Sequence, residues 1–127
     1  MKKGRFYFID NFDKKKNDHF FLVIIEDENF SEEEILNEYY RKLKLPDYFG
    51  FNWDALQDCL RDLDWIEQRD VVIYHQQLPR LNEKDLKIYL RILDDIVGHW
   101  DKFEEHNFYV YFNISDYDTI CKYIGNF

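Results

Sequence analysis

The chain has 127 residues, which is enough for one domain with a single hydrophobic core, and we place that domain at residues 1–127. Asp and Glu number 26 against 17 Lys and Arg, and the resulting net charge of -9 argues against direct nucleic-acid binding and favours basic protein partners. No apolar stretch could span a bilayer or form a signal-peptide core, so we expect a cytoplasmic protein without membrane attachment.

The N-terminal part begins with two apolar segments, residues 5–9 and 20–25, and both predict strands. The polar residues 10–18 between them predict a hairpin, with the basic run at residues 14–16 as a solvated tip rather than a nucleic-acid site. Residues 1–18 would then add an edge strand. Every residue from 20 to 25 is apolar, which is typical of a central strand covered on both faces.

Two consecutive helices are predicted next. Ser31 and Glu34 form a capping box, and an apolar stripe at helical spacing continues until the chain reaches Pro46. Asn52 follows a turn that contains Pro and Gly, and it can cap a second helix that begins at Trp53.

The second half of the chain alternates strand and helix. The segments are a buried strand at 71–74, a long helix at 82–103, a strand at 108–114 and a short helix at 115–124. Ser115 and Asp118 form a capping pair for the last helix, and Gly125 ends it. Strands that alternate with helices predict an α/β protein with a parallel sheet and right-handed crossovers.

The helix that starts at Trp53 has one apolar face and one acidic face. The apolar face carries Leu56, Cys59, Leu60 and Leu63, and the other carries Asp54, Asp58, Arg61 and Asp62. Asp54 and Asp58 repel each other at i,i+4, and Asp62 lies in the last turn, where the helix dipole disfavours a negative charge. These carboxylates are therefore either an ordinary solvated face or a surface that binds a partner.

The sequence around this helix resembles the central motif of the barstar family, the intracellular inhibitors of the ribonuclease barnase. The string is Leu-Pro-x-Tyr-aromatic-Gly-x-Asn-x-Asp-Ala-Leu-x-Asp-Cys-Leu, and it runs without a gap from Leu45 to Leu60. A weaker resemblance extends over about residues 20–114. It implies a small three-layer fold with a three-stranded parallel sheet and packed helices, to which this chain adds an N-terminal strand and a short C-terminal helix.

The resemblance also implies a binding surface for a nuclease. On the loop it would contain Tyr48, Phe49, Gly50 and Asn52, and on the helix Asp54, Gln57 and Asp58. By position, Asp58 would take the place of a substrate phosphate in the nuclease active site. A second acidic contribution would come from Asp94 or Asp95, for which a solvated helix face is an equally good interpretation.

Two positions depart from the family pattern. The family usually has a large aromatic residue where Gln57 stands and a polar residue where Phe51 stands. Trp53 or Trp65 could restore an aromatic contact nearby. Because specificity is a difference between affinities, such changes can exclude one nuclease and retain a related one.

Nothing in the sequence predicts catalysis, a cofactor or a metal site. The four histidines are scattered, and the four glycines form no phosphate-binding loop. Cys59 and Cys121 are isolated and predicted to be reduced. Asp94 and Asp95 are adjacent on a helix, so their side chains diverge and do not form an acid-base pair.

We therefore expect an immunity-type protein, monomeric when free, that blocks a basic extracellular or toxin ribonuclease. The alternative is an interaction or regulatory module with the same fold that binds another basic protein, such as a DNase toxin or a transcription component. An enzyme that acts on a cationic substrate is a third, weaker interpretation.

Overall fold

The computed structural model describes residues 1–12 and 19–125. These residues contain a five-stranded sheet with helices packed against it. The strands are β1 (Lys2–Lys3), β2 (Phe6–Ile9), β3 (Phe20–Ile25), β4 (Asp70–His75) and β5 (Asn107–Asn113). Their order across the sheet is β1-β2-β5-β4-β3. All neighbours are parallel except β1, which pairs antiparallel with β2.

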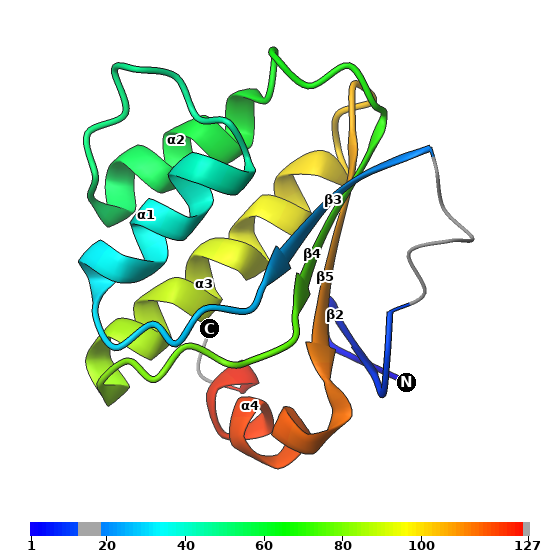
Figure 1. Ribbon diagram of the computed structural model, residues 1–127. Helices are drawn as coiled ribbons and strands as arrows, with labels where there is room; N and C mark the ends of the chain where they lie inside the picture. Colours follow the sequence, from blue (N-terminus) through cyan, green and yellow to red (C-terminus); the bar gives the residue numbers. More distant parts are fainter. Residues whose placement is uncertain (13–18, 126–127) are drawn as a thin grey trace.

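The helices are α1 (Glu32–Lys42), α2 (Trp53–Asp62), α3 (Glu83–Trp100) and α4 (Tyr117–Ile124). Figure 1 shows α1, α2 and α3 together on one side of the sheet, and α4 beyond the end of β5. Helix α3 packs against both β5 and α2, while α1 packs against β3. The predicted α/β class is confirmed, and the arrangement is consistent with the small three-layer fold.

The N-terminal strand does not form the predicted hairpin with residues 20–25. Instead β2 lies parallel to β5, where Phe6 and Phe8 pack their rings against Phe112, with centroids 5.2 and 5.9 Å apart. The extra N-terminal strand therefore joins the three predicted parallel strands as a fourth parallel strand. Residues 14–16, the expected hairpin tip, lie outside the described residues.

A second prediction about the sheet was also wrong, because β3 is an edge strand and β4 is central. Every residue of β4 from Val71 to His75 is buried, whereas four of the six residues of β3 are partly exposed. A run of apolar residues predicts a strand, but it does not say how many neighbours that strand has.

The helix ends agree with the predictions in part. Ser31 accepts a hydrogen bond from the Glu34 N–H at 3.2 Å, as the capping box predicts. The third helix ends at Trp100, three residues before the predicted end at Phe103. At the C-terminus Ser115 is not a cap: it lies in a 3-10 turn, Ile114–Asp116, that precedes α4.

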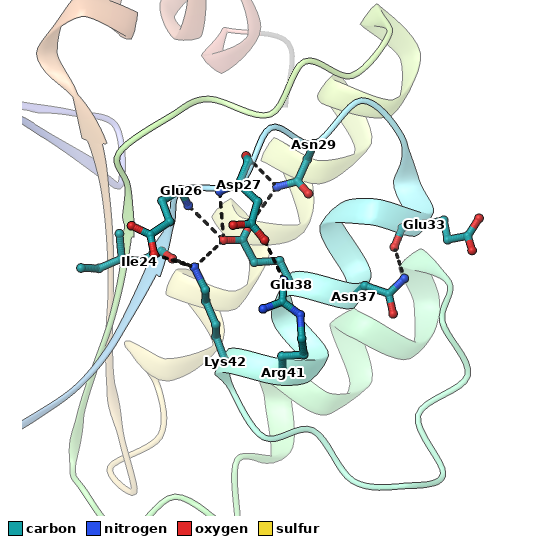
Figure 2. A network of polar contacts seen from close by, with 9 residues as sticks. All are labelled: Ile24, Glu26, Asp27, Asn29, Glu33, Asn37, Glu38, Arg41 and Lys42. Atoms are coloured by element: carbon teal, nitrogen blue, oxygen red, sulfur yellow. Dashed lines mark hydrogen bonds and ion pairs between the residues drawn. The ribbon is translucent and has the colours of Figure 1, made fainter.

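Helix α1 is joined to the end of β3 through the carboxylate of Glu38, which is 0% exposed (Figure 2). Its Oε2 accepts hydrogen bonds from the Lys42 ammonium at 2.6 Å and from the Glu26 N–H at 3.0 Å, and its Oε1 accepts one from the Asn29 amide at 2.7 Å. Burial alone would raise the pKa of Glu38, but the hydrogen bonds from Lys42 and Asn29 and from the backbone lower it below its ordinary value.

A second buried network connects the sheet to α1 and α3. The Nδ1 of His75 lies 3.0 Å from the Tyr111 carbonyl, and its Nε2 lies 2.6 Å from the Tyr89 hydroxyl. Because a carbonyl only accepts, Nδ1 carries the proton and Nε2 accepts from Tyr89, whose oxygen lies 2.6 Å from the Tyr39 hydroxyl. Burial favours the neutral imidazole and lowers the pKa of His75 to about 4.

Substitution of Glu38 by Gln should destabilise the protein by about 2 kcal/mol, because the partly buried Lys42 ammonium then loses its charged acceptor. Urea unfolding at pH 7 measures this loss. Glu33→Gln is a matched control on the exposed side of the same helix, and it should change the stability by less than about 0.5 kcal/mol. Equal effects of the two changes would contradict the role assigned to Glu38.

Protonation of His75 should destabilise the protein in acid. The pKa falls from 6.5 in the unfolded chain to about 4 in the folded protein, so this contribution is complete above pH 6.5 and is lost as the pH falls toward 4. The corresponding loss between pH 7 and pH 5 is about 2 kcal/mol. Urea unfolding of the wild type and of His75→Gln at both pH values should show a smaller pH dependence in the variant. The same pH dependence in both proteins would exclude His75 as its source.

Candidate functional site

The loop between α1 and α2 presents one aromatic side chain outward and buries the next. Tyr48 is 76% exposed, whereas Phe49 is only 5% exposed and stacks on Tyr40 with ring centroids 6.3 Å apart. The Phe49 N–H donates to the Pro46 carbonyl at 2.9 Å, which closes a turn. Of the two aromatic residues expected on the binding surface, Tyr48 therefore extends into solvent, whereas Phe49 is buried and holds the loop against α1.

Gly50 is exposed, and the free protein does not need a glycine there. A Cβ added at Gly50 would lie 3.6 Å from the nearest atoms of Ala55 and Asn52, which are ordinary contact distances. Its backbone is not among those with positive φ, in contrast to Phe51 with a φ of 51°. The fold therefore does not require a glycine at this position, and the absence of a side chain leaves the backbone accessible to a partner.

Helix α2 is fixed on the scaffold at its start and along its apolar face. The Asn52 side chain caps it by accepting from the Ala55 N–H at 2.7 Å, as its position predicts. Leu56, Cys59 and Leu60 are buried. The indole of Trp100 on α3 donates to the Leu60 carbonyl at 2.8 Å, so α2 is tied to α3 by a buried hydrogen bond.

The acidic face of α2 points into solvent. Asp54, Asp58 and Asp62 are all exposed, and none of them forms an ion pair with another described residue. Their field reaches into the helix: the pKa of the Cys59 thiol is raised, first by burial and then by the carboxylates of Asp62 and Asp58. Such a surface attracts cationic groups, from which its carboxylates can accept charge-assisted hydrogen bonds.

Helix α3 contributes Asp95, not Asp94, to the same surface. The Gln57 amide of α2 donates to Asp95 Oδ2 at 3.4 Å. Asp94 lies instead beside Arg5, whose guanidinium donates to Asp94 Oδ2 at 3.2 Å. Burial raises the pKa of Asp94, against the effect of Arg5. The structure therefore separates two neighbours that the sequence left equivalent.

Neither tryptophan near the motif extends outward as a replacement for the family's aromatic residue. Trp65 is partly buried, and its indole donates to the Leu43 carbonyl at 2.9 Å. Trp53 is also partly buried, with its ring 6.0 Å from that of Tyr89. Both contribute to packing around the loop and α2.

The sequence reasoning missed two contacts that shape this surface, Gln57 with Asp95 and Arg5 with Asp94. Both join residues far apart in the chain, and no local pattern marks them. The structure also shows that the large hydrophobic side chain of Phe51 is 41% exposed.

The histidines and cysteines of the described residues form no metal-binding group. His75 and His106 are buried and bonded to carbonyl groups, Cys59 and Cys121 are free thiols, and no group of three potential ligands in residues 1–12 and 19–125 is placed to hold a metal. Within the same residues, no helix is long and apolar enough to cross a membrane.

A comparison with known families agrees with this geometry. The sequence model of the family Barstar, described as barnase inhibitor, matches residues 19–113, which include β3 to β5 and every candidate residue on the loop, α2 and α3. No curated protein matches the chain. The strands β1 and β2 and the helix α4 lie outside the matched region. Because the match covers most of the chain, this protein belongs to the Barstar (barnase inhibitor) family.

Proposed function

We propose that this protein inhibits a basic, barnase-like ribonuclease by covering the nuclease active site with the loop before α2 and the acidic face of α2. The observation that carries this proposal is the exposed, unpaired carboxylate of Asp58 on a helix that is fixed by buried contacts. Asp54 lies one turn earlier, and Asp95 is held beside α2 by Gln57. Family membership supports the same function.

In the proposed mechanism Asp58 occupies the place of a substrate phosphate. It accepts charge-assisted hydrogen bonds from the Arg, Lys or His side chains that bind phosphate in the nuclease. Asp54 and Asp95 extend the negative surface, and Tyr48 and the open backbone at Gly50 supply the contact on the loop side. Because α2 is already fixed in the free protein, little ordering is needed on binding.

The proposed biological role is that of an immunity protein in the cytoplasm, monomeric when free, which captures a ribonuclease toxin before it reaches RNA. The net charge of -9 supports fast association with a basic partner. This role involves binding only, without catalysis, cofactor or metal.

Asp58→Ala should weaken binding to a barnase-like ribonuclease by about 2 kcal/mol or more, which is the size typical of a hot-spot residue. Titration of ribonuclease activity with the wild type should give stoichiometric inhibition that weakens with added salt. Asp118→Ala, on an exposed part of α4, is the matched control and should inhibit like the wild type. If Asp58→Ala also inhibits like the wild type, the phosphate-mimic assignment is wrong. If the wild type does not inhibit, the partner is a different nuclease or another basic protein, such as a DNase.

The two carboxylates on α3 should differ in their effect on the same titration. Asp95→Asn removes a charge beside α2 and should weaken inhibition by about 1 kcal/mol, whereas Asp94→Asn should leave it within about 0.5 kcal/mol of the wild type. Unfolding measurements on both variants separate binding from stability. A larger binding loss for Asp94→Asn would reverse the assignment.

A further inference from the structure

An open cleft lies beside the proposed binding loop, against the outer side of α1. It has a volume of about 460 Å³ and is lined by Phe51 from the loop and by Glu32, Glu33 and Asn37 from α1.

The ring of Phe51 packs against two aromatic rings and remains partly exposed. Its centroid lies 4.7 Å from that of Phe49 and 5.1 Å from that of Tyr40, and the side chain remains 41% exposed. The exposed ring of Phe30 provides a comparison within the molecule, because the Arg80 guanidinium lies over it at 5.9 Å. No cation of residues 1–12 or 19–125 lies over Phe51 in the same way.

The carboxylates in the cleft are also available. Glu34 serves the helix cap, and the amide of Asn37 donates to the backbone carbonyl of Glu33 at 3.0 Å (Figure 2). The side chains of Glu32 and Glu33 form no hydrogen bond or ion pair with any residue that the structure describes. The helix dipole favours acidic residues in this first turn, but it does not account for an exposed aromatic ring beside them.

We propose that this cleft binds an arginine side chain of the partner protein, as a second anchor outside the phosphate-binding centre of the nuclease. A guanidinium is planar, so it can stack on the ring of Phe51 while its N–H groups donate to the carboxylate of Glu33. A lysine ammonium offers no such plane. The identity of the partner rests on the proposed function, whereas the chemistry of the cleft does not.

The position of Phe51 makes the cleft a determinant of specificity. Phe51 lies between Gly50 and Asn52, which are both on the proposed nuclease-binding surface. The rim of the active site of a nuclease bound to that surface therefore lies next to the cleft. A nuclease with an arginine at this rim gains a contact, and one with an acidic residue there meets Glu32 and Glu33 and is repelled.

The first test uses small probes and needs no nuclease. The protein is titrated with N-acetylarginine amide and, separately, with its neutral isostere N-acetylcitrulline amide, while NMR follows the Phe51 ring and the backbone amides of α1 and α2. We expect saturable shifts at Phe51, Glu33 and Asn37 with the arginine probe, and binding about ten-fold weaker with the citrulline probe. Equal shifts with both probes, or shifts spread evenly over the acidic surface, would overturn the proposal.

Variants locate the arginine probe in the cleft. Phe51→Asn removes the ring with a residue that tolerates the positive φ, and Glu33→Gln removes the charge; both should abolish the saturable shifts. Phe103→Asn, which removes another exposed ring, and Asp58→Ala should leave them unchanged. Retention of the shifts in Phe51→Asn, with folding verified by its amide spectrum, would also refute the proposal.

The second test separates this proposal from the proposed function. With a barnase-like ribonuclease that has an arginine at the rim of its active site, Phe51→Asn should weaken inhibition by about ten-fold or more, and Phe103→Asn should not. Unchanged inhibition by Phe51→Asn together with a loss in Asp58→Ala would reject the cleft and keep the inhibitor. Arginine-probe binding without any inhibition by the wild type would keep the cleft and reject this ribonuclease as the partner.

Discussion

The position of the candidate site depends on the buried carboxylate of Glu38. A charge with no exposed surface is costly unless donors surround it, and here an ammonium, an amide and two backbone N–H groups do so. These donors come from the end of β3, the following turn and α1 itself (Figure 2). Lys42 also donates to the Ile24 carbonyl at 2.7 Å, which satisfies an acceptor on this edge strand. The network therefore fixes α1, and the C-terminal end of α1 begins the loop that carries Tyr48.

The acidic face of α2 is possible because its opposite face is well anchored. Repulsion between neighbouring carboxylates on an exposed helix costs only about 0.5 kcal/mol per pair. The buried side chains of Leu56 and Leu60 and the hydrogen bond from Trp100 offset that cost. A helix that holds unpaired negative charge in a fixed geometry suits a cationic partner, because neither the backbone nor the neighbouring helix must rearrange. The exposed charges are thus tolerated because the apolar face maintains the fold.

Local signals predicted the elements but not their pairing. The capping box at Ser31 and the cap at Asn52 were correct because a cap involves residues only three positions apart. The hairpin between residues 5–9 and 20–25 was predicted because strands joined by a short connection usually pair with each other. It was wrong because Phe6 and Phe8 are buried against β5, about a hundred residues later in the chain. The prediction of a central strand at residues 20–25 failed for a related reason, since α1 covers one side of an edge strand whose sequence is continuously apolar.

The sequence by itself determined the family, the α/β class, the helices with most of their caps, and the acidic face of α2, because periodicity and capping depend on residues within a few positions of each other. Only the tertiary structure decided that Asp95 rather than Asp94 lies beside α2, that Phe49 is buried below an exposed Tyr48, and that Phe51 faces two unpaired glutamates. These outcomes depend on how α1, α2 and α3 pack on the sheet. The contacts that distinguish Asp95 from Asp94 join residues 38 and 89 positions apart, a separation over which no sequence pattern fixes a distance.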